Sequence, residues 1–246
     1  MKKYDTLIIG SSFFSLGYAS FAKGTLIVEE SEMLDTTFYL PMVGFNIPPL
    51  MPTTAKGREL YMICHERGIF DNGFMNVHAL EIALCRYAEL NPTDIYLKCR
   101  AVEITDCGEG FTVTLLHNGG LVEVYASRVI DTRRVPRGKG LLTVIFKCEG
   151  DAPRDALLSA FPGSLLTEAF YKGRYALHVL VDTNDINRAK LDVCNTWEQF
   201  SDYPILYVAP VIHYPAAITP DMCDAVYGDP ISAFDAGVIA AGGKKI

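Results

Sequence analysis

The first thirty residues constrain the fold of this chain more than any other segment. Residues 4–9 form a short apolar run ending at Gly10, and residues 12–22 carry apolar side chains at helical spacing. Gly24 then precedes a second apolar run, 25–28, which is closed by two glutamates. Short apolar runs of this kind are typical of buried parallel strands, and the helix between them makes the two strands parallel. The segment therefore predicts a βαβ unit and an α/β fold.

The turn between the first strand and the helix is a candidate phosphate-binding loop. In the pattern G-x-G-x-x-G, the first glycine allows the tight turn, the second lets the backbone approach a pyrophosphate, and the third allows close packing of helix and strand. Here only the first glycine is present, and serine at the second position places a Cβ where a phosphate would approach. The helix N-terminus still offers free N–H groups to an anion. The candidate cofactor-binding residues of this turn are Gly10, Ser11, Ser12, Phe13, Phe14 and Ser15.

The two acids after the second apolar run extend this candidate site. Glu29 lies nineteen residues beyond Gly10 and is followed by Glu30. An acid at this point of a dinucleotide-binding unit accepts hydrogen bonds from a ribose hydroxyl. The alternatives are a solvated acid at a strand end, and an α/β fold whose nucleotide site has been lost.

The remaining sequence predicts alternating helices and strands. Four prolines break up residues 38–52, so we expect an irregular excursion there. Glycine-rich turns at 108–110 and 118–120 separate three expected antiparallel strands. The expected helices are 55–68, 76–90, 185–200 and 228–241, and the expected strands are 94–100, 102–105, 111–116, 121–125, 128–131, 141–148, a hairpin over 165–181 that turns at Lys172-Gly173, and 205–212.

Three later segments resemble the FAD-dependent oxidoreductases with a glutathione-reductase-type flavin domain. Residues 76–131 follow that family's order of helix, strand, three-stranded β-meander and short apolar strand. Residues 126–132 are similar to its strand ending in Ala-Thr-Gly, although Asp131 and Arg133 replace the alanine and the glycine. Gly228-Asp229, before a final apolar helix, is similar to its C-terminal Gly-Asp motif.

The resemblance implies a Rossmann-like FAD-binding domain with a parallel sheet and a β-meander. This domain would be discontinuous, over residues 1–136 and 215–246, around a small β-rich α+β substrate domain at 137–214. It also implies that Asp229 contacts the ribityl chain of FAD, and it adds Val102, Thr132 and Gly228 to the cofactor-binding residues. The alternative role of Asp229 is to cap a helix that begins at Pro230. Because the chain has no second glycine-rich βαβ unit, we expect no nicotinamide domain.

Composition excludes several other classes of protein. The net charge of −7 argues against a surface for nucleic acid, and no apolar run reaches the roughly eighteen residues that span a membrane. The seven cysteines are scattered without a metal-ligand spacing, so we expect free thiols, no metal site and a cytoplasmic protein.

Side chains for catalysis are less clearly indicated. The candidates are His213 and Tyr214, which precede the return to the flavin domain, and His178 in the expected hairpin. A basic cluster at positions 133, 134, 137 and 139 is a solvated crossover or a site for an acidic substrate. We expect an FAD-binding oxidoreductase that acts on a small molecule. Two alternatives stay open: a non-catalytic relative used as a binding or interaction module, and a Rossmann protein that binds NAD or another adenosine ligand.

Overall fold

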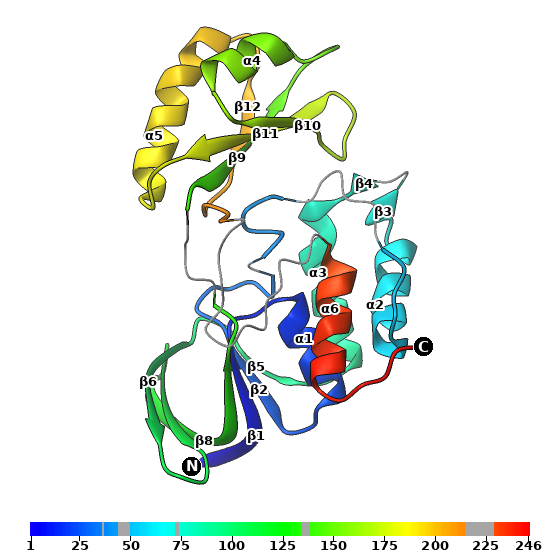
Figure 1. Ribbon diagram of the computed structural model, residues 1–246, viewed down its shortest axis with the longest axis vertical. Helices are drawn as coiled ribbons and strands as arrows, with labels where there is room; N and C mark the ends of the chain where they lie inside the picture. Colours follow the sequence, from blue (N-terminus) through cyan, green and yellow to red (C-terminus); the bar gives the residue numbers. More distant parts are fainter. Residues whose placement is uncertain (36, 44–49, 72–73, 134–137, 215–228) are drawn as a thin grey trace.

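A six-stranded mixed sheet forms the centre of the first of two lobes in the computed structural model (Figure 1), which describes residues 1–35, 37–43, 50–71, 74–133, 138–214 and 229–246. Its strands lie in the order β5-β2-β1-β8-β7-β6. Strands β5, β2, β1 and β8 are parallel neighbours, which confirms the predicted βαβ unit. The bounds are Lys2–Ile9 (β1), Thr25–Val28 (β2), Asp94–Tyr96 (β5), Arg100–Asp106 (β6), Phe111–His117 (β7) and Gly120–Asp131 (β8).

Strand β8 joins the parallel sheet to the β-meander. Its first half pairs antiparallel with β7, and its second half pairs parallel with β1. The prediction of two separate strands, 121–125 and 128–131, was therefore wrong. Ser127 and Arg128 interrupt the apolar pattern because they are exposed, while Ala126 pairs with both neighbouring strands. The strand predicted at 94–100 ends at Tyr96, because Lys98 takes a left-handed conformation with φ of 52° and turns the chain into β6.

The two faces of this sheet are covered by different elements. Alternate side chains such as Ile8 and Ile27 pack with the helices, whereas Leu7 and Leu26 pack under the meander strands β7 and β8. The helices are α1 (Phe13–Phe21), α2 (Ala55–Glu66), α3 (Leu80–Leu90, after the 3-10 turn η1, Val77–Ala79) and α6 (Pro230–Ala240). Because successive side chains of β1 and β2 point to opposite faces of the sheet, these two strands contribute to two hydrophobic cores.

Helices α1 and α6 touch through their backbones. A Cβ on Gly17 would overlap the carbonyl oxygen of Phe234, and one on Gly237 would overlap that of Phe14. Only glycine permits this approach, which places the start of α6 beside the first turn of the chain. Figure 1 shows the two helices side by side.

The second lobe is built on an antiparallel sheet in the order β10-β11-β9-β12. Helices α4 and α5 cover one face, while Ile145 and Ala176 on the other face join the core of the first lobe. The lobe is α+β as predicted, although the sequence analysis missed α4 and the small hairpin β3–β4 in the first lobe. The bounds are Gly140–Lys147 (β9), Leu165–Glu168 (β10), Arg174–Val181 (β11), Ile205–Val208 (β12), Arg154–Ala160 (α4), Ile186–Trp197 (α5, followed by η2, Glu198–Phe200), Phe70–Asp71 (β3) and Phe74–Met75 (β4).

In the part of the chain that the structure describes, no helix has the length and apolar character needed to cross a membrane. Within the same residues, no group of three or more His, Cys, Asp or Glu side chains is placed to hold a metal ion. The domain boundaries at 137 and 214 remain predictions.

Candidate functional site

A hollow of about 480 Å³ lies at the carboxyl ends of β1, β2 and β8, a volume within the range of small-molecule sites. It brings together eight of the predicted residues: Gly10, Ser11, Ser12, Glu29, Glu30, Thr132, His213 and Tyr214. Nine other lining residues were not predicted to bind the cofactor: Ile9, Val28, Ser31, Thr37, Leu40, Pro41, Arg133, Val211 and Ile212. Residues from the start of the chain therefore line the same hollow as residues 132–133 and 211–214, which lie about 90 to 200 positions later in the sequence.

Gly10 has the conformation that the tight turn requires. Its φ is +98°, in the region that favours glycine, and an added Cβ would lie 2.7 Å from Thr132 Oγ1. The backbone N–H of Thr132 donates to Ile9 O at 2.9 Å, and its hydroxyl donates to the same oxygen, also at 2.9 Å. The threonine of the Ala-Thr-Gly-like strand thus fixes the end of β8 to the first turn.

The two serines at glycine positions serve different purposes. Ser12 is extended, with φ of −156°, so its backbone does not need glycine, and its side chain caps α1 by accepting from Ser15 N at 3.2 Å. The buried Ser15 hydroxyl donates to Gly10 O at 2.7 Å and so closes the turn. Phe13 and Phe14 are buried; their side chains do not line the hollow, and only their backbone N–H groups belong to the helix terminus.

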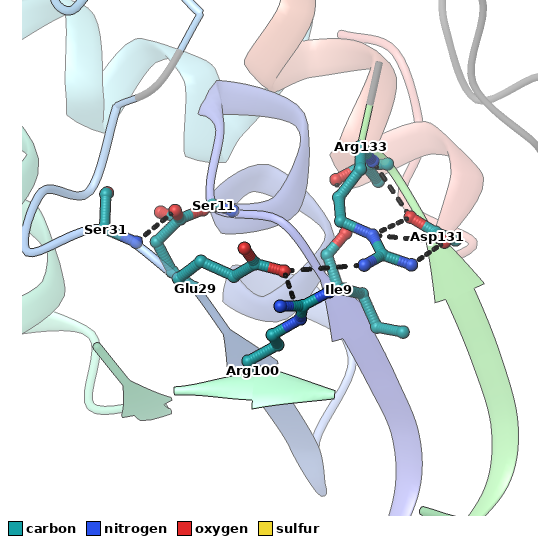
Figure 2. Close-up of polar contacts among 9 residues, drawn as sticks. Ile9, Ser11, Glu29, Ser31, Arg100, Asp131 and Arg133 are labelled. Carbon is teal, nitrogen blue, oxygen red and sulfur yellow. Dashed lines mark hydrogen bonds and ion pairs between the residues drawn. The ribbon is translucent and has the colours of Figure 1, made fainter. Parts of the chain in front are cut away.

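Glu29 is held by the backbone around it. Its carboxylate accepts from Ser11 N and from Ser31 N, each at 2.7 Å, and the residue is 6% exposed (Figure 2). This role in fixing the turn was not predicted. Because each carboxylate oxygen has a second lone pair, the predicted hydrogen bond to a ribose remains chemically possible.

Glu30 and Arg133 form ion pairs at the rim of the hollow. Glu30 Oε1 lies 3.6 Å from Arg133 Nη1 and 3.7 Å from Arg100 Nε. Arg133 also donates to Asp131, with Nη2 at 2.7 Å and Nε at 3.0 Å, as Figure 2 shows. The hydrogen bonds to Asp131 raise the pKa of Arg133 further above its usual range, so the guanidinium stays charged. An added Cβ on Gly10 would lie 3.5 Å from Arg133 Cγ, so the arginine stem crosses directly over the turn.

His213 and Tyr214 reach the hollow from the segment after β12. The backbone of His213 exchanges two hydrogen bonds with Leu141 at the start of β9, at 2.7 and 2.9 Å. The ring of Tyr214 lines the hollow, while its hydroxyl donates to Thr183 O at 3.3 Å. Partial burial raises the pKa of Tyr214, so the hydroxyl stays protonated at neutral pH.

Besides Phe13, Phe14 and Ser15, three further predicted positions do not line the hollow. Asp229 is buried and caps α6 by accepting from Ile231 N at 2.9 Å and Ser232 N at 3.1 Å. Val102 lies in a bulge of β6 and is 45% exposed. His178 is buried, with Nδ1 2.9 Å from Thr143 Oγ1 and Nε2 3.4 Å from Thr167 Oγ1. Burial lowers the pKa of His178 to about 4, so it is neutral at pH 7.

Some predicted positions lie outside the described residues, namely Gly228, Arg134 and Arg137. Of the predicted basic cluster, Arg133 lines the hollow and Lys139 does not.

The loop that carries Thr37, Leu40 and Pro41 could have been recognised from one residue. Asp35 is completely buried and accepts hydrogen bonds from the backbone N–H groups of Thr37, Phe38 and Tyr39, at 2.8 to 3.0 Å. An aspartate that binds its own following backbone is a known turn former.

No protein-family model matches the sequence, and no curated protein sequence matches it. Solved structures do match the fold. A flavoprotein/dehydrogenase from Cytophaga hutchinsonii has a TM-score of 0.55 at 13% identity, over 98% of this chain and 77% of that protein. The p-nitrophenol 4-monooxygenase PnpA from Pseudomonas putida DLL-E4 has a TM-score of 0.53 at 9% identity, over 89% of this chain and 70% of PnpA.

The fold is that of solved flavoproteins. BexE, a protein connected by its study with oxidation during BE-7585A biosynthesis, has a TM-score of 0.59 at 12% identity and is matched by 97% of this chain. The chain spans 60% of the length of BexE. At these identities the likeness concerns the fold, and it supports the predicted combination of a parallel sheet with a second, antiparallel sheet. The finer resemblance to glutathione-reductase-type flavin domains remains a prediction.

Proposed function

We propose that this protein binds FAD in the hollow at the ends of β1, β2 and β8, and that it is an oxidoreductase for a small molecule. The observation that carries the proposal is the place of the hollow in the sheet. From β1 the chain first builds outward through β2 and β5, and β8 later adds to the other side of β1. Open α/β sheets bind ligands at this point of reversal, outside the carboxyl ends of the strands.

The residues around the hollow fit a dinucleotide. Gly10 supplies the tight turn, the N-terminus of α1 leaves backbone N–H groups free for an anion, and Glu29 has a carboxylate that can accept from a ribose. One structural neighbour is a flavoprotein/dehydrogenase, which supports a flavin over other dinucleotides. When bound, FAD supplies the transfer of hydride or electrons, and the chain's own residues position it and exclude water.

A binding module without catalysis is the second candidate. It is favoured by the surroundings of the expected catalytic side chains, because His178 is buried between two threonines and the Tyr214 hydroxyl already donates to a carbonyl. An FAD-loaded protein whose flavin is not reduced by any small-molecule donor would support this candidate.

The test of FAD binding compares two glycines with the same kind of backbone. We expect purified protein to carry flavin absorption bands, or to acquire them when FAD is added, with binding measurable by calorimetry. Gly10→Ala should abolish binding, because the new Cβ meets Thr132 and the backbone has a positive φ.

Gly108→Ala is the matched control for this test. Its φ is +85° and an added Cβ meets nothing within 4 Å, so this substitution brings similar backbone strain at a turn of the meander and should leave binding intact. Wild-type protein that stays colourless and binds no FAD would contradict the proposal.

We also propose that the protein is cytoplasmic with reduced thiols. The six cysteines that the structure describes are free, at positions 64, 85, 99, 107, 148 and 194, and Cys223 lies outside the described residues.

A further inference from the structure

The hydroxyl groups at the first turn donate their protons to different kinds of acceptor. Ser15 donates its proton to Gly10 O, and Thr132 donates its own to Ile9 O. Ser12 Oγ accepts from Ser15 N and lies 3.0 Å from Ser15 Oγ, whose proton is already committed. The Ser12 proton therefore points to another hydroxyl, not to a carbonyl, and it is the one that a ligand in the hollow can take over.

Carboxylates line the hollow, so an anionic ligand needs a positively charged side chain beside it in order to bind. Glu29 and Glu30 both line it, and Asp131 lies next to it on β8. Arg133 is the only lysine or arginine among the described lining residues. Its stem crosses the turn at Gly10, so its guanidinium needs only side-chain rotation to face the turn.

Release of Arg133 from Glu30 costs little, because the two side chains are 43% and 49% exposed and exposed ion pairs contribute little to stability. Asp131 is the stronger partner: its side chain is only 18% exposed and accepts from both Nε and Nη2 of Arg133, so a ligand must offer the guanidinium a contact of at least equal strength. A pyrophosphate has more negative charge than either carboxylate and offers bidentate oxygen pairs, which suit a guanidinium.

We infer that Ser12 and Arg133 form a phosphate-binding pair for a dinucleotide. Ser12 donates its hydroxyl proton to a phosphate oxygen while it still caps α1, and the Arg133 guanidinium turns from Glu30 to the pyrophosphate. Serine at the second glycine position of the turn and arginine at the glycine position of the Ala-Thr-Gly-like strand thus replace the missing backbone contacts with a hydroxyl and a cation. This inference rests on the proposed function for its ligand, but it concerns the pyrophosphate and not the flavin.

The experiment measures binding of FAD, ADP-ribose and inorganic pyrophosphate by calorimetry, with thermal unfolding to show that each variant is folded. Arg133→Gln should weaken FAD and ADP-ribose by about ten- to hundredfold, since a charge-assisted contact is lost. Arg133→Lys should recover part of this affinity. Ser12→Asp retains the helix cap, because aspartate caps as well as serine, but it should weaken both ligands by removing the donor and adding a negative charge.

Arg100→Gln is the matched control, because Arg100 pairs with the same Glu30 oxygen but does not line the hollow. It should leave all three affinities unchanged. An equal loss in Arg100→Gln and Arg133→Gln would overturn the inference, because the effect would then come from Glu30.

The remaining outcomes separate this inference from the proposed function. If wild-type protein binds FAD and Arg133→Gln binds it equally well or more tightly, the inference is wrong while FAD binding stands. If wild-type protein binds ADP-ribose but not FAD, and the variants lose this binding, the inference stands and the ligand is another adenosine dinucleotide. If wild-type protein binds pyrophosphate alone, the claim that the pair serves a dinucleotide is overturned. If none of the three ligands binds to wild-type protein, both are overturned.

Discussion

Buried hydroxyl groups in this protein bond to backbone carbonyls or to a buried imidazole. Ser15 and Thr132 close the first turn with hydroxyl protons, and His178 lies between the hydroxyls of Thr143 and Thr167 in the second sheet. Such pairs stabilise the fold only while each group stays uncharged or hydrogen-bonded, because an unpaired buried charge is costly. His178 is thus a structural residue with a measurable dependence on pH.

Stability should fall as the pH falls from about 6.5 toward 4 because of His178. Burial lowers the pKa of the folded state to about 4, so the unfolded chain binds the proton first and acid favours unfolding. The full contribution is up to about 3 kcal/mol, and it is present above pH 6.5. Urea unfolding of wild type and His178→Gln across this range checks it: the difference in free energy between the two should shrink as the pH drops. A difference that does not depend on pH would contradict it.

At the scale of elements, the contact between α1 and α6 controls the candidate site. Helix α1 begins at the Gly10 turn and α6 begins after its N-cap Asp229, so the glycine contact between the two helices fixes both N-termini. This explains how the last helix of the chain is positioned beside the first.

Gly237→Ala should therefore damage both stability and binding. Its Cβ would overlap the backbone of Phe14, and because a backbone cannot move aside as a side chain can, we expect a loss of about 3 kcal/mol or more. Ile239→Ala, at an exposed position of the same helix, should change stability by less than about 0.5 kcal/mol. Thermal unfolding and FAD calorimetry of both variants measure this; a Gly237→Ala protein of normal stability would show that the helices are not in backbone contact.

At the scale of the whole molecule, the hollow depends on both lobes. Its floor comes from the ends of β1, β2 and β8, and residues 211–214 close it from the segment that follows the second sheet. The face of that sheet that carries Ile145 and Ala176 shares a core with the first lobe, which keeps this wall in place.

FAD should thus protect backbone amides in both parts of the chain. Hydrogen exchange with and without FAD should slow at residues 10–13, 29–31 and 212–214, and should not change in α5, which lies away from the hollow. Protection confined to the first lobe would show that residues 211–214 do not contact the ligand.

Local patterns in the sequence were sufficient for the elements and the class of fold. Apolar runs, glycine turns and helical spacing depend on neighbouring residues, so β1, α1, β2, the meander and the hairpin β10–β11 could be predicted within a few residues. The Gly10 turn and the two acids could be selected for the site in the same way, because strand ends in a parallel sheet converge, whereas Thr132 was indicated only by the resemblance to the flavin-domain strand that ends in Ala-Thr-Gly.

Tertiary structure alone decided how these groups are used. Thr132 and Gly10 are 122 residues apart in sequence, yet they are in contact. No pattern of neighbouring residues predicts that the Arg133 side chain lies over the Gly10 turn or that His178 is buried. The continuity of β8 depends on two partner strands, and the hydrogen bonds of Glu29 depend on the position of two backbone amides. Such contacts form only when distant segments pack together, because packing and not local preference determines which polar groups lose water and must find partners.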